Sequence, residues 1–383
     1  MSGPQIAPAE VEAILADLVR IPTPNPPGDE VRVVDHITAL LDGAGVAWTA
    51  DDLAPGRPNL HVHLGRRGAP ALVLNGHSDT MPAGEGWTTD PWEPVVRDGV
   101  MTGLGACDMK AGLAAMLLVA LALQRSRTQL ARGLRLDIVA DEEATGAGSR
   151  LAAARQPLPA AVVVVEPTRL ALVPVGNGQI NIAYTVRGAA AHGSTPGLGS
   201  NAVAAASRAV VALEHWAETR RPATHRLIGA ESLSIGTIAG GMKTSVVPDR
   251  CRFSVDLRVA PGRDPDRAAA EADAVVDTAI GGIAGIAWTR ETEIRVPPFL
   301  TPDDDPLCAA LQRAHGAVVG GPPTVTGMQA TTDAAWYAER GVATVVYGPG
   351  DLANAHRPDE FVPLAEVVTA SRVLLELALS IAG

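Results

Sequence analysis

The stretch ALVLNGHSDT at residues 71–80 decides the fold, because its apolar run ends at a glycine and is followed at once by a histidine. The stretches LRLDIVADEE at residues 134–143 and AVVVVE at residues 161–166 have the same form. Short apolar runs bounded in this way are typical of strands buried in a parallel sheet. We therefore predict three such strands whose carboxyl ends meet at one edge, where open α/β sheets bind their ligands.

Five side chains in and around these stretches are candidate metal ligands: His77, Asp108, Glu143, Glu166 and His356. Two imidazoles and three carboxylates form a mixed nitrogen and oxygen set that zinc accepts, and five residues can hold two metals if one carboxylate bridges them. A metal pair can clamp a water, lower its pKa towards about 7 and polarise a carbonyl group. Glu142 would then act as the general base. We expect Asp79 to accept a hydrogen bond from the nitrogen of His77 that binds no metal.

The order of these runs predicts an α/β fold with an insertion. Strand-like and helix-like segments alternate up to about Glu166, the pattern of a mostly parallel sheet with helices on both faces. Alternating strands then follow at residues 179–186, 232–238 and 252–259, with a helix expected at residues 202–215. We therefore expect a discontinuous domain of residues 1–177 and 292–383 that carries the five ligands. Residues 178–291 would form an inserted two-layer α+β domain.

Composition excludes some classes of function. The formal charge is −11 and no basic stripe is present, which argues against a nucleic-acid partner. The apolar run at residues 111–123 is too short to span a bilayer, so we expect a buried helix and no membrane partner. The three cysteines are odd in number and lack metal-binding spacing, and the amino terminus has no signal-like region. We therefore expect a cytoplasmic protein.

The five ligand contexts, in this order, resemble those of the M20 metallopeptidases. The resemblance also includes IPTPNPPGDE at residues 21–30, GAAAHGSTP at 188–196, GPG at 348–350 and AHRPDE at 355–360, so it covers nearly the whole chain. Each motif is weak alone, but the ordered set is specific. The family includes acetylornithine deacetylase, succinyl-diaminopimelate desuccinylase, aminoacylase-1 and carboxypeptidase G2.

The resemblance implies a role for each ligand and for each domain. Asp108 would bridge two zinc ions, with His77 and Glu166 on one and Glu143 and His356 on the other. Cobalt or manganese can replace zinc in a carboxylate-rich site. The larger domain would be catalytic, and the insert would be a lid and dimerisation domain. The protein is therefore expected to be a homodimer.

The resemblance also assigns catalytic and substrate-binding residues. Glu142 matches the general base, and His192 matches a lid histidine that steadies the developing oxyanion. Arg258 matches an arginine that binds a substrate carboxylate through its planar fork. Ser245 replaces an asparagine that contacts the substrate or the oxyanion in several relatives, and Leu104 replaces the usual arginine.

The predicted function is hydrolysis of the amide bond of an N-acyl amino acid or a related N-acylated small amine, through a metal-bridging hydroxide and Glu142. Glu166 resembles the desuccinylases, whereas GPG and AHRPDE resemble the acetylornithine enzymes, so the acyl group stays open. Alternatives are a dipeptidase or carboxypeptidase on the same scaffold, or a catalytically silent binding protein. Retention of Glu142 beside all five ligands argues against the silent protein.

Ordinary structural roles compete with these assignments. Asp108 could be a helix N-cap, and the acidic triplet at residues 141–143 could be a solvated turn. His192 could be a loop histidine, and Arg258 could form a structural salt bridge. His61 and His63 alternate in an expected strand, and we expect them at the surface or at a sheet edge.

Overall fold

The computed structural model describes residues 3–219 and 224–383 and divides the chain into two compact units. The first unit consists of Met1–Pro174, Leu300–Gly327 and Thr332–Gly383. The second unit consists of Val175–Phe299 and a short return, Met328–Thr331. Each unit has its own cluster of buried apolar side chains.

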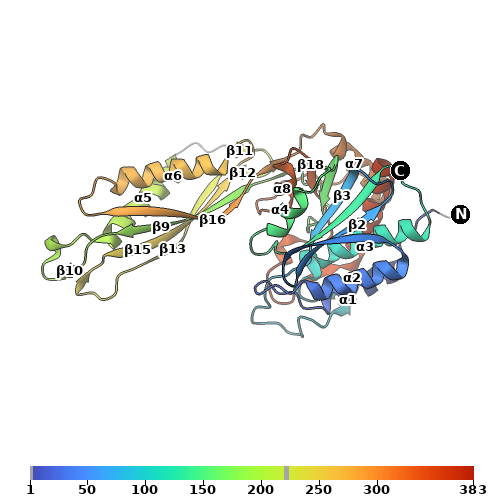
Figure 1. The fold of residues 1–383 in the computed structure, drawn as a ribbon, viewed down its shortest axis with the longest axis horizontal. Coiled ribbons are helices and arrows are strands. Elements are labelled where there is room, and N and C mark those ends of the chain that lie inside the picture. Colours follow the sequence, from blue (N-terminus) through green and yellow to red (C-terminus); the bar gives the residue numbers. More distant parts are fainter. Residues whose placement is uncertain (1–2, 220–223) are drawn as a thin grey trace. The chain divides into compact units, whose positions relative to one another are not determined.

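The first unit is built on a six-stranded mixed sheet (Figure 1). Its strand order is β1(Ala47–Ala54), β2(Arg57–Leu64), β6(Gly133–Val139), β3(Pro70–His77), β7(Ala161–Val164) and β18(Ala343–Val346). The four strands from β6 to β18 are parallel to their neighbours, and β1 and β2 add an antiparallel pair at one edge. Strands β3, β6 and β7 are buried along their whole length. The predicted mostly parallel α/β architecture is therefore confirmed.

Helices cover both faces of this sheet because side chains alternate along each strand. Leu72 and Leu74 of β3 belong to the apolar core that also includes the helices of one face. On this face lie α1(Pro8–Val19), α2(Val31–Ala44), α3(Ala111–Arg125), α7(Pro306–Val319) and α9(Leu364–Ala382). Asn75 points the other way and contacts Ser149 and Tyr337. Those residues belong to α4(Ala147–Ala153) and α8(Ala334–Ala338) on the second face.

Helix α3 is apolar on all sides and buried from Ala111 to Leu123, and only Gln124 and Arg125 at its end are exposed. Of the described residues, the segment Ala106–Arg125 is the one helical stretch long and apolar enough to cross a membrane, with a mean hydropathy of 1.8. Residues 106–123 of this segment are all buried inside the protein. A helix that is apolar all round is expected in the core of a large unit, so we interpret α3 as a core helix.

The second unit has two layers. Its antiparallel sheet has the order β13(Ser232–Gly240), β15(Arg250–Val259), β9(Gly178–Arg187) and β16(Ala287–Val296). Figure 1 shows α5(Ala202–Thr219) and α6(Pro265–Ile280) along one face of this sheet. Every second residue of β15 is buried beneath them. The unit extends past residue 291, the boundary expected from the sequence, because β16 pairs with β9 as far as Val296.

Short elements complete the described chain. The strands β4(Val95–Arg97), β5(Val100–Thr102) and β19(Phe361–Pro363) form a small sheet. Three two-stranded pairs are β10(Ala191–His192) with β14(Val246–Val247), β11(Thr224–His225) with β12(Gly229–Ala230), and β8(Val175–Gly176) with β17(Phe299–Leu300). Single helical turns are η1(Ala106–Lys110), η2(Pro196–Leu198) and η3(Leu352–Asn354).

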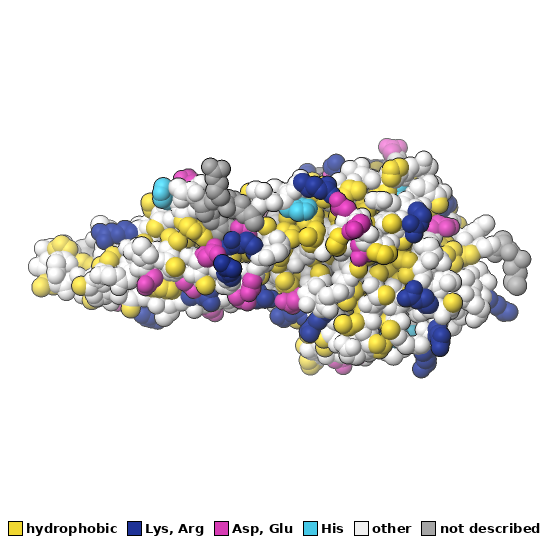
Figure 2. All heavy atoms as spheres, turned by 90° about the horizontal axis from the view of Figure 1, so that it is seen from above, with side chains coloured by type: hydrophobic (Ala, Val, Ile, Leu, Met, Phe, Trp, Pro, Cys, Tyr) yellow, Lys and Arg dark blue, Asp and Glu magenta, His cyan; other side chains and the backbone are white. Residues whose placement is uncertain are grey.

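Charged side chains are mixed on the surface that Figure 2 shows. Basic side chains, in dark blue, and acidic side chains, in magenta, are interspersed over both units, without a continuous basic area on that face. A protein that binds nucleic acid normally gathers its Lys and Arg side chains in a patch or stripe. The visible face therefore offers no such footprint.

Candidate metal centre

Three adjacent parallel strands deliver candidate ligands to one edge of the sheet. His77 is the last residue of β3, the acidic triplet follows β6, and Glu166 follows β7 closely. Backbone hydrogen bonds continue the sheet past the strand ends, from Ser78 N–H to the Val139 carbonyl and from Val165 N–H to the Asn75 carbonyl. The strand ends are therefore held in register where the candidate ligands begin.

The remaining two candidates come from loops. Asp108 lies in the turn that precedes α3 and is 6% exposed. His356 lies between β18 and β19 in a left-handed backbone conformation, with φ of 57°. A positive φ is uncommon for a residue with a side chain, so the local backbone is constrained at this position. The imidazole of His356 is about half exposed, and that of His77 is buried.

The five side chains converge with Asp108 at the centre. Oδ1 of Asp108 lies 3.1 Å from Nε2 of His77, and its Oδ2 lies 3.3 Å from Nε2 of His356. Glu166 Oε1 lies 3.7 Å from the same nitrogen of His77, and Glu143 Oε2 lies 3.0 Å from that of His356. Each oxygen of one carboxylate thus faces a different histidine, and each histidine has one further carboxylate beside it.

These separations fit a metal-binding set. Two ligand atoms each about 2.1 Å from a tetrahedral zinc are about 3.4 Å apart. The four separations above range from 3.0 to 3.7 Å. Candidate ligand atoms of His77, Asp108 and Glu143 all lie within 4.8 Å of one another. The donor types are those that zinc and related divalent metals accept.

The electrostatics of the cluster also favour a cation. Burial, together with the neighbouring carboxylates, raises the pKa of Glu142 and that of Glu166 well above the usual range. Burial would also raise the pKa of Asp108, but hydrogen bonds from His356 and His77 hold it below its usual value. Hydrogen bonds to Asp108 and Glu143 raise the pKa of His356 to about 10. Crowded buried carboxylates gain stability from positive charge, which a bound divalent ion would provide.

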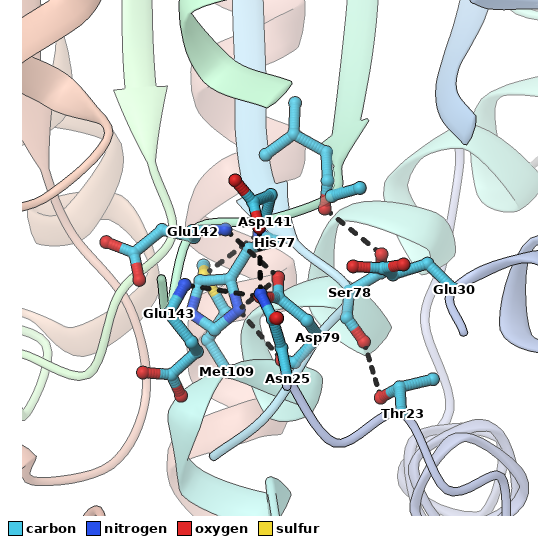
Figure 3. A network of polar contacts seen from close by, with 12 residues as sticks. Thr23, Asn25, Glu30, His77, Ser78, Asp79, Met109, Asp141, Glu142 and Glu143 are labelled. Carbon is cyan, nitrogen blue, oxygen red and sulfur yellow. Dashed lines mark hydrogen bonds and ion pairs between the residues drawn. The ribbon is translucent and has the colours of Figure 1, made fainter. Parts of the chain in front are cut away.

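Asp79 contacts the site differently from the sequence-based expectation (Figure 3). Nδ1 of His77 lies 2.9 Å from the backbone carbonyl oxygen of Asp79 and 3.6 Å from its carboxylate. The carboxylate instead accepts hydrogen bonds from the backbone N–H groups of Glu142 and Glu143, both at 3.2 Å. The carbonyl of Asp79 thus selects the tautomer that leaves Nε2 of His77 available, and its carboxylate orients the acidic turn.

A second set of polar residues supports this turn, and the sequence-based assignment gave it no role. Nδ2 of Asn25 donates to Asp79 at 2.8 Å and to Asp141 at 3.1 Å, so it joins the two carboxylates in Figure 3. Arg57 donates to Asp141 at 2.8 Å and pairs with the fully buried Glu30. Asp141 has φ of 68°. Asn25 and Glu30 lie in the motif quoted at residues 21–30, so that motif was the sequence feature that could have pointed to their role.

Two further buried carboxylates lie close to the ligands in the chain or in space. Glu360, 1% exposed, accepts hydrogen bonds from backbone N–H groups of the loop that carries Asp108. Burial raises the pKa of Asp333 to about 7, although the nearby imidazole of His77 lowers it, and the carboxylate of Asp79 raises it further. The sequence indicated nothing about Asp333, because it follows no strand and belongs to none of the quoted motifs.

The second unit holds the other three predicted site residues. His192 and Ser245 are neighbours, because β10 pairs with β14 and Gly193 N–H donates to the Ser245 carbonyl at 2.8 Å. Both are exposed. Ser194 N–H donates to Nδ1 of His192 at 3.2 Å, which places the proton of the neutral ring on Nε2. Arg258 lies near the carboxyl end of β15, whereas Ser245 precedes the amino end of that strand, and Arg258 forms an ion pair with Asp256 at 2.9 Å.

Leu104 does not take part in the site. Its side chain is 3% exposed, and its N–H donates to the Pro91 carbonyl at 2.8 Å. The leucine is therefore a buried residue of the loop before Asp108.

Comparison with known proteins gives one family over most of the chain. Residues 73–380 match the peptidase family M20/M25/M40. An acetylornithine deacetylase of Myxococcus xanthus is 31% identical over 95% of this chain and 95% of its own length. A probable succinyl-diaminopimelate desuccinylase of Staphylococcus epidermidis is 28% identical over 91% of this chain and 92% of its own length.

Solved structures share the fold. The aminopeptidase PepT of Bacillus cereus has a TM-score of 0.81 with 21% identity, over 99% of this chain and 100% of that one. The YXEP protein of Bacillus subtilis, described as a dinuclear metal-binding peptidase of the M20 family, has a TM-score of 0.74 with 18% identity over 98% of both chains. The ordered motifs, the converging ligands and the match over residues 73–380 agree, and the chain belongs to the peptidase family M20/M25/M40.

Proposed function

We propose that the protein is a metal-dependent amidohydrolase that removes the acyl group from an N-acyl amino acid or a related small amine. The observation that carries this proposal is the position of Asp108, whose two oxygens face the imidazoles of His77 and His356 at 3.1 and 3.3 Å. The relatives named acetylornithine deacetylase and succinyl-diaminopimelate desuccinylase support the N-acyl amine class.

The residues present would hold two metals. His77 and Glu166 would bind one, Glu143 and His356 the other, and Asp108 both, as their pairwise contacts suggest. When bound, such a pair supplies an acidified water and Lewis-acid polarisation of the scissile carbonyl. We propose zinc as the native metal, because it accepts a mixed set of imidazole and carboxylate ligands. Cobalt or manganese could replace it, because a carboxylate-rich set tolerates several divalent metals.

We propose Glu142 as the residue that moves the proton. Within residues 3–219 and 224–383, it forms no ion pair with either imidazole, unlike Glu143 and Glu166. Its backbone N–H is fixed by Asp79, and desolvation raises the pKa of its carboxyl group well above the usual value. With two divalent cations beside it, this carboxyl group would be ionised and would take the proton from the attacking water and pass it to the leaving amine.

The second unit supports a composite site in a homodimer. Strands β9 and β15 are antiparallel, with Arg187 opposite Arg250 at one end and Gln179 opposite Arg258 at the other. The chain continues from Arg187 to His192, so His192 lies beyond the end that is far from Arg258. Arg258 lies eight positions after Arg250 along this extended strand, about 27 Å at about 3.4 Å per residue. One small substrate cannot span that length. If His192 and Arg258 both contact it, they come from two subunits of a two-fold dimer.

A substrate panel tests the proposed function. Metal-reconstituted protein would be offered N-acetyl, N-succinyl and N-formyl amino acids beside dipeptides, with the liberated amine as the readout. Release from an N-acyl substrate supports the proposal. Exclusive cleavage of dipeptides assigns a peptidase instead, and full metal loading without turnover of any substrate indicates a binding protein.

We also propose that the protein acts in the cytoplasm. All three cysteines are buried and free, as a reducing compartment favours.

A further inference from the structure

Glu360 joins the two loops that carry Asp108 and His356. It lies four residues after His356 and is 1% exposed. Its Oε1 accepts hydrogen bonds from the N–H groups of Cys107 at 2.7 Å and Asp108 at 2.9 Å. Its Oε2 accepts from Gly105 N–H at 3.2 Å, and its backbone carbonyl accepts from Gly103 N–H at 2.9 Å. One residue thus receives four hydrogen bonds from the loop before α3.

The loop around Asp108 needs such an anchor. Asp108 has φ of −115° and ψ of 99°, which interrupts the helical turn η1, and its N–H donates to the side chain of Glu360. Gly105 has φ of 75°, and residues 104–110 are all buried. Buried backbone N–H groups without acceptors are costly, so the carboxylate of Glu360 stabilises a loop conformation that regular secondary structure does not supply.

Lys110 holds the other end of the same loop. It is fully buried, its Nζ donates to the Ile21 carbonyl at 2.8 Å, and it lies 5.5 Å from the centre of the Trp92 ring. It also interacts electrostatically with Glu360. Asp108 is therefore fixed from both sides, through Lys110 to the segment at Ile21 and through Glu360 to the loop of His356.

We propose that Glu360 is a positioning residue that couples the two metal positions. Its described hydrogen bonds go to backbone N–H groups and not to either imidazole, and they fix the backbone of the shared ligand Asp108 from the loop that presents His356. Order in one ligand loop is thereby transmitted to the other, so loss of Glu360 weakens both positions rather than one. The inference rests on the proposed metal centre.

The test measures metal affinity rather than activity. Glu360→Gln keeps one carbonyl oxygen for Cys107 and Asp108 but turns an NH₂ group towards Gly105 N–H, whereas Glu360→Ala removes all three side-chain hydrogen bonds. Removing partners of metal ligands typically weakens metal binding by about 10–100-fold. In chelator competition with zinc, we expect a loss of about tenfold for the Gln variant and about 100-fold for the Ala variant, at both positions.

A matched control separates this effect from general damage. Glu231 is 6% exposed and accepts Ala260 N–H at 3.1 Å, but it belongs to the second unit. Glu231→Gln should leave zinc affinity unchanged. Circular dichroism and thermal unfolding of the metal-free proteins identify any variant that fails to fold. If Glu360→Ala fails to fold, the result for Glu360→Gln decides the test.

The outcomes distinguish the inference from the function on which it rests. If the parent binds two zinc ions and folded Glu360→Gln binds both with an affinity within about twofold of the parent, the positioning role is wrong. Loss confined to one position, or equal loss in Glu231→Gln, overturns the coupling as well. If the parent binds no zinc, the proposed metal centre itself fails.

Discussion

Glu142 and Glu143 are consecutive in the chain, yet their side chains have different surroundings. Glu143 Oε2 lies 3.0 Å from His356 Nε2, whereas Glu142 contributes only its backbone N–H to the described hydrogen bonds around Asp79. Both backbone groups are held by the same carboxylate, which fixes the turn so that the two side chains separate. This difference leads to a prediction for each glutamate.

Replacing Glu142 by Gln should keep two metals per chain while lowering kcat by on the order of 10²–10⁴-fold, because the amide cannot accept the proton from water. Elemental analysis and steady-state kinetics on the same preparation measure both quantities. Glu143→Gln is the matched control and should lose metal. Turnover of Glu142→Gln within a factor of about two of the parent would contradict the role of base.

Removal of Asp108 should affect both metal positions, because each of its oxygens faces a different imidazole. Asp108→Ala should therefore lose metal at both, whereas His356→Ala should lose mainly one. Chelation should abolish activity, and added zinc or cobalt should restore it. The measurement is the metal content of each purified variant after dialysis, and a full complement in Asp108→Ala would show that this carboxylate is not shared.

At the residue scale, the sequence predicts which side chains gather but not how they contact one another. The positions of His77 and Glu166 could be predicted because they lie at or just after the ends of buried strands. The spacing of His77 and Asp79 does not show whether the carbonyl or the carboxylate of Asp79 faces the ring, and the structure selects the carbonyl. Asp108 and His356 come from loops, so the sequence pointed to them only through motif order.

At the scale of elements, the position of β2 explains why His61 is buried. The sequence-based expectation placed His61 at the surface or at a sheet edge, and that was wrong for this residue because its ring packs against the fully buried Asp137 of the neighbouring strand β6. Nδ1 of His61 lies 2.7 Å from Asp137 of β6, which also accepts hydrogen bonds from Arg135 and Tyr337, both at 2.8 Å. Asp137 thus links two strands to α8.

Replacing Asp137 by Asn should lower the free energy of unfolding by about 3–5 kcal/mol, because Arg135 would be left buried without its counter-charge. Denaturant titration measures this. Burial would raise the pKa of Asp137, but Arg135 and His61 hold it below its usual value. The contribution of the carboxylate should therefore be complete above about pH 4 and fall only as the pH drops further.

Asp52→Asn is the control for that substitution, because Asp52 is exposed on β1. It should change the free energy of unfolding by less than about 0.5 kcal/mol. If both substitutions changed the free energy of unfolding equally, the contacts of Asp137 with His61, Arg135 and Tyr337 would contribute no more to stability than an exposed carboxylate does.

At the scale of the whole molecule, the sequence changes near residue 179 from continuous apolar runs to alternating strands. This change predicts a second unit whose sheet is covered on one face only. The alternation in β15 matches a sheet covered by helices on one side only. The end of that unit was harder to place, because β16 is an exposed strand whose sequence, AWTRETEIRV, has few apolar residues. No pattern in one chain reveals which residues of a second chain complete a site.

Subunit exchange tests that last point. If His192 acts in the site of the partner, homodimers of Glu142→Gln and of His192→Ala should each be nearly inactive. A heterodimer has one site with both defects and one site with Glu142 from one chain and His192 from the other. Statistical exchange makes half the molecules heterodimers, each with one intact site of two, so activity should recover to about a quarter of the parent level. Mass spectrometry confirms the exchange, and its occurrence without recovered activity would place His192 in the site of its own subunit or outside catalysis.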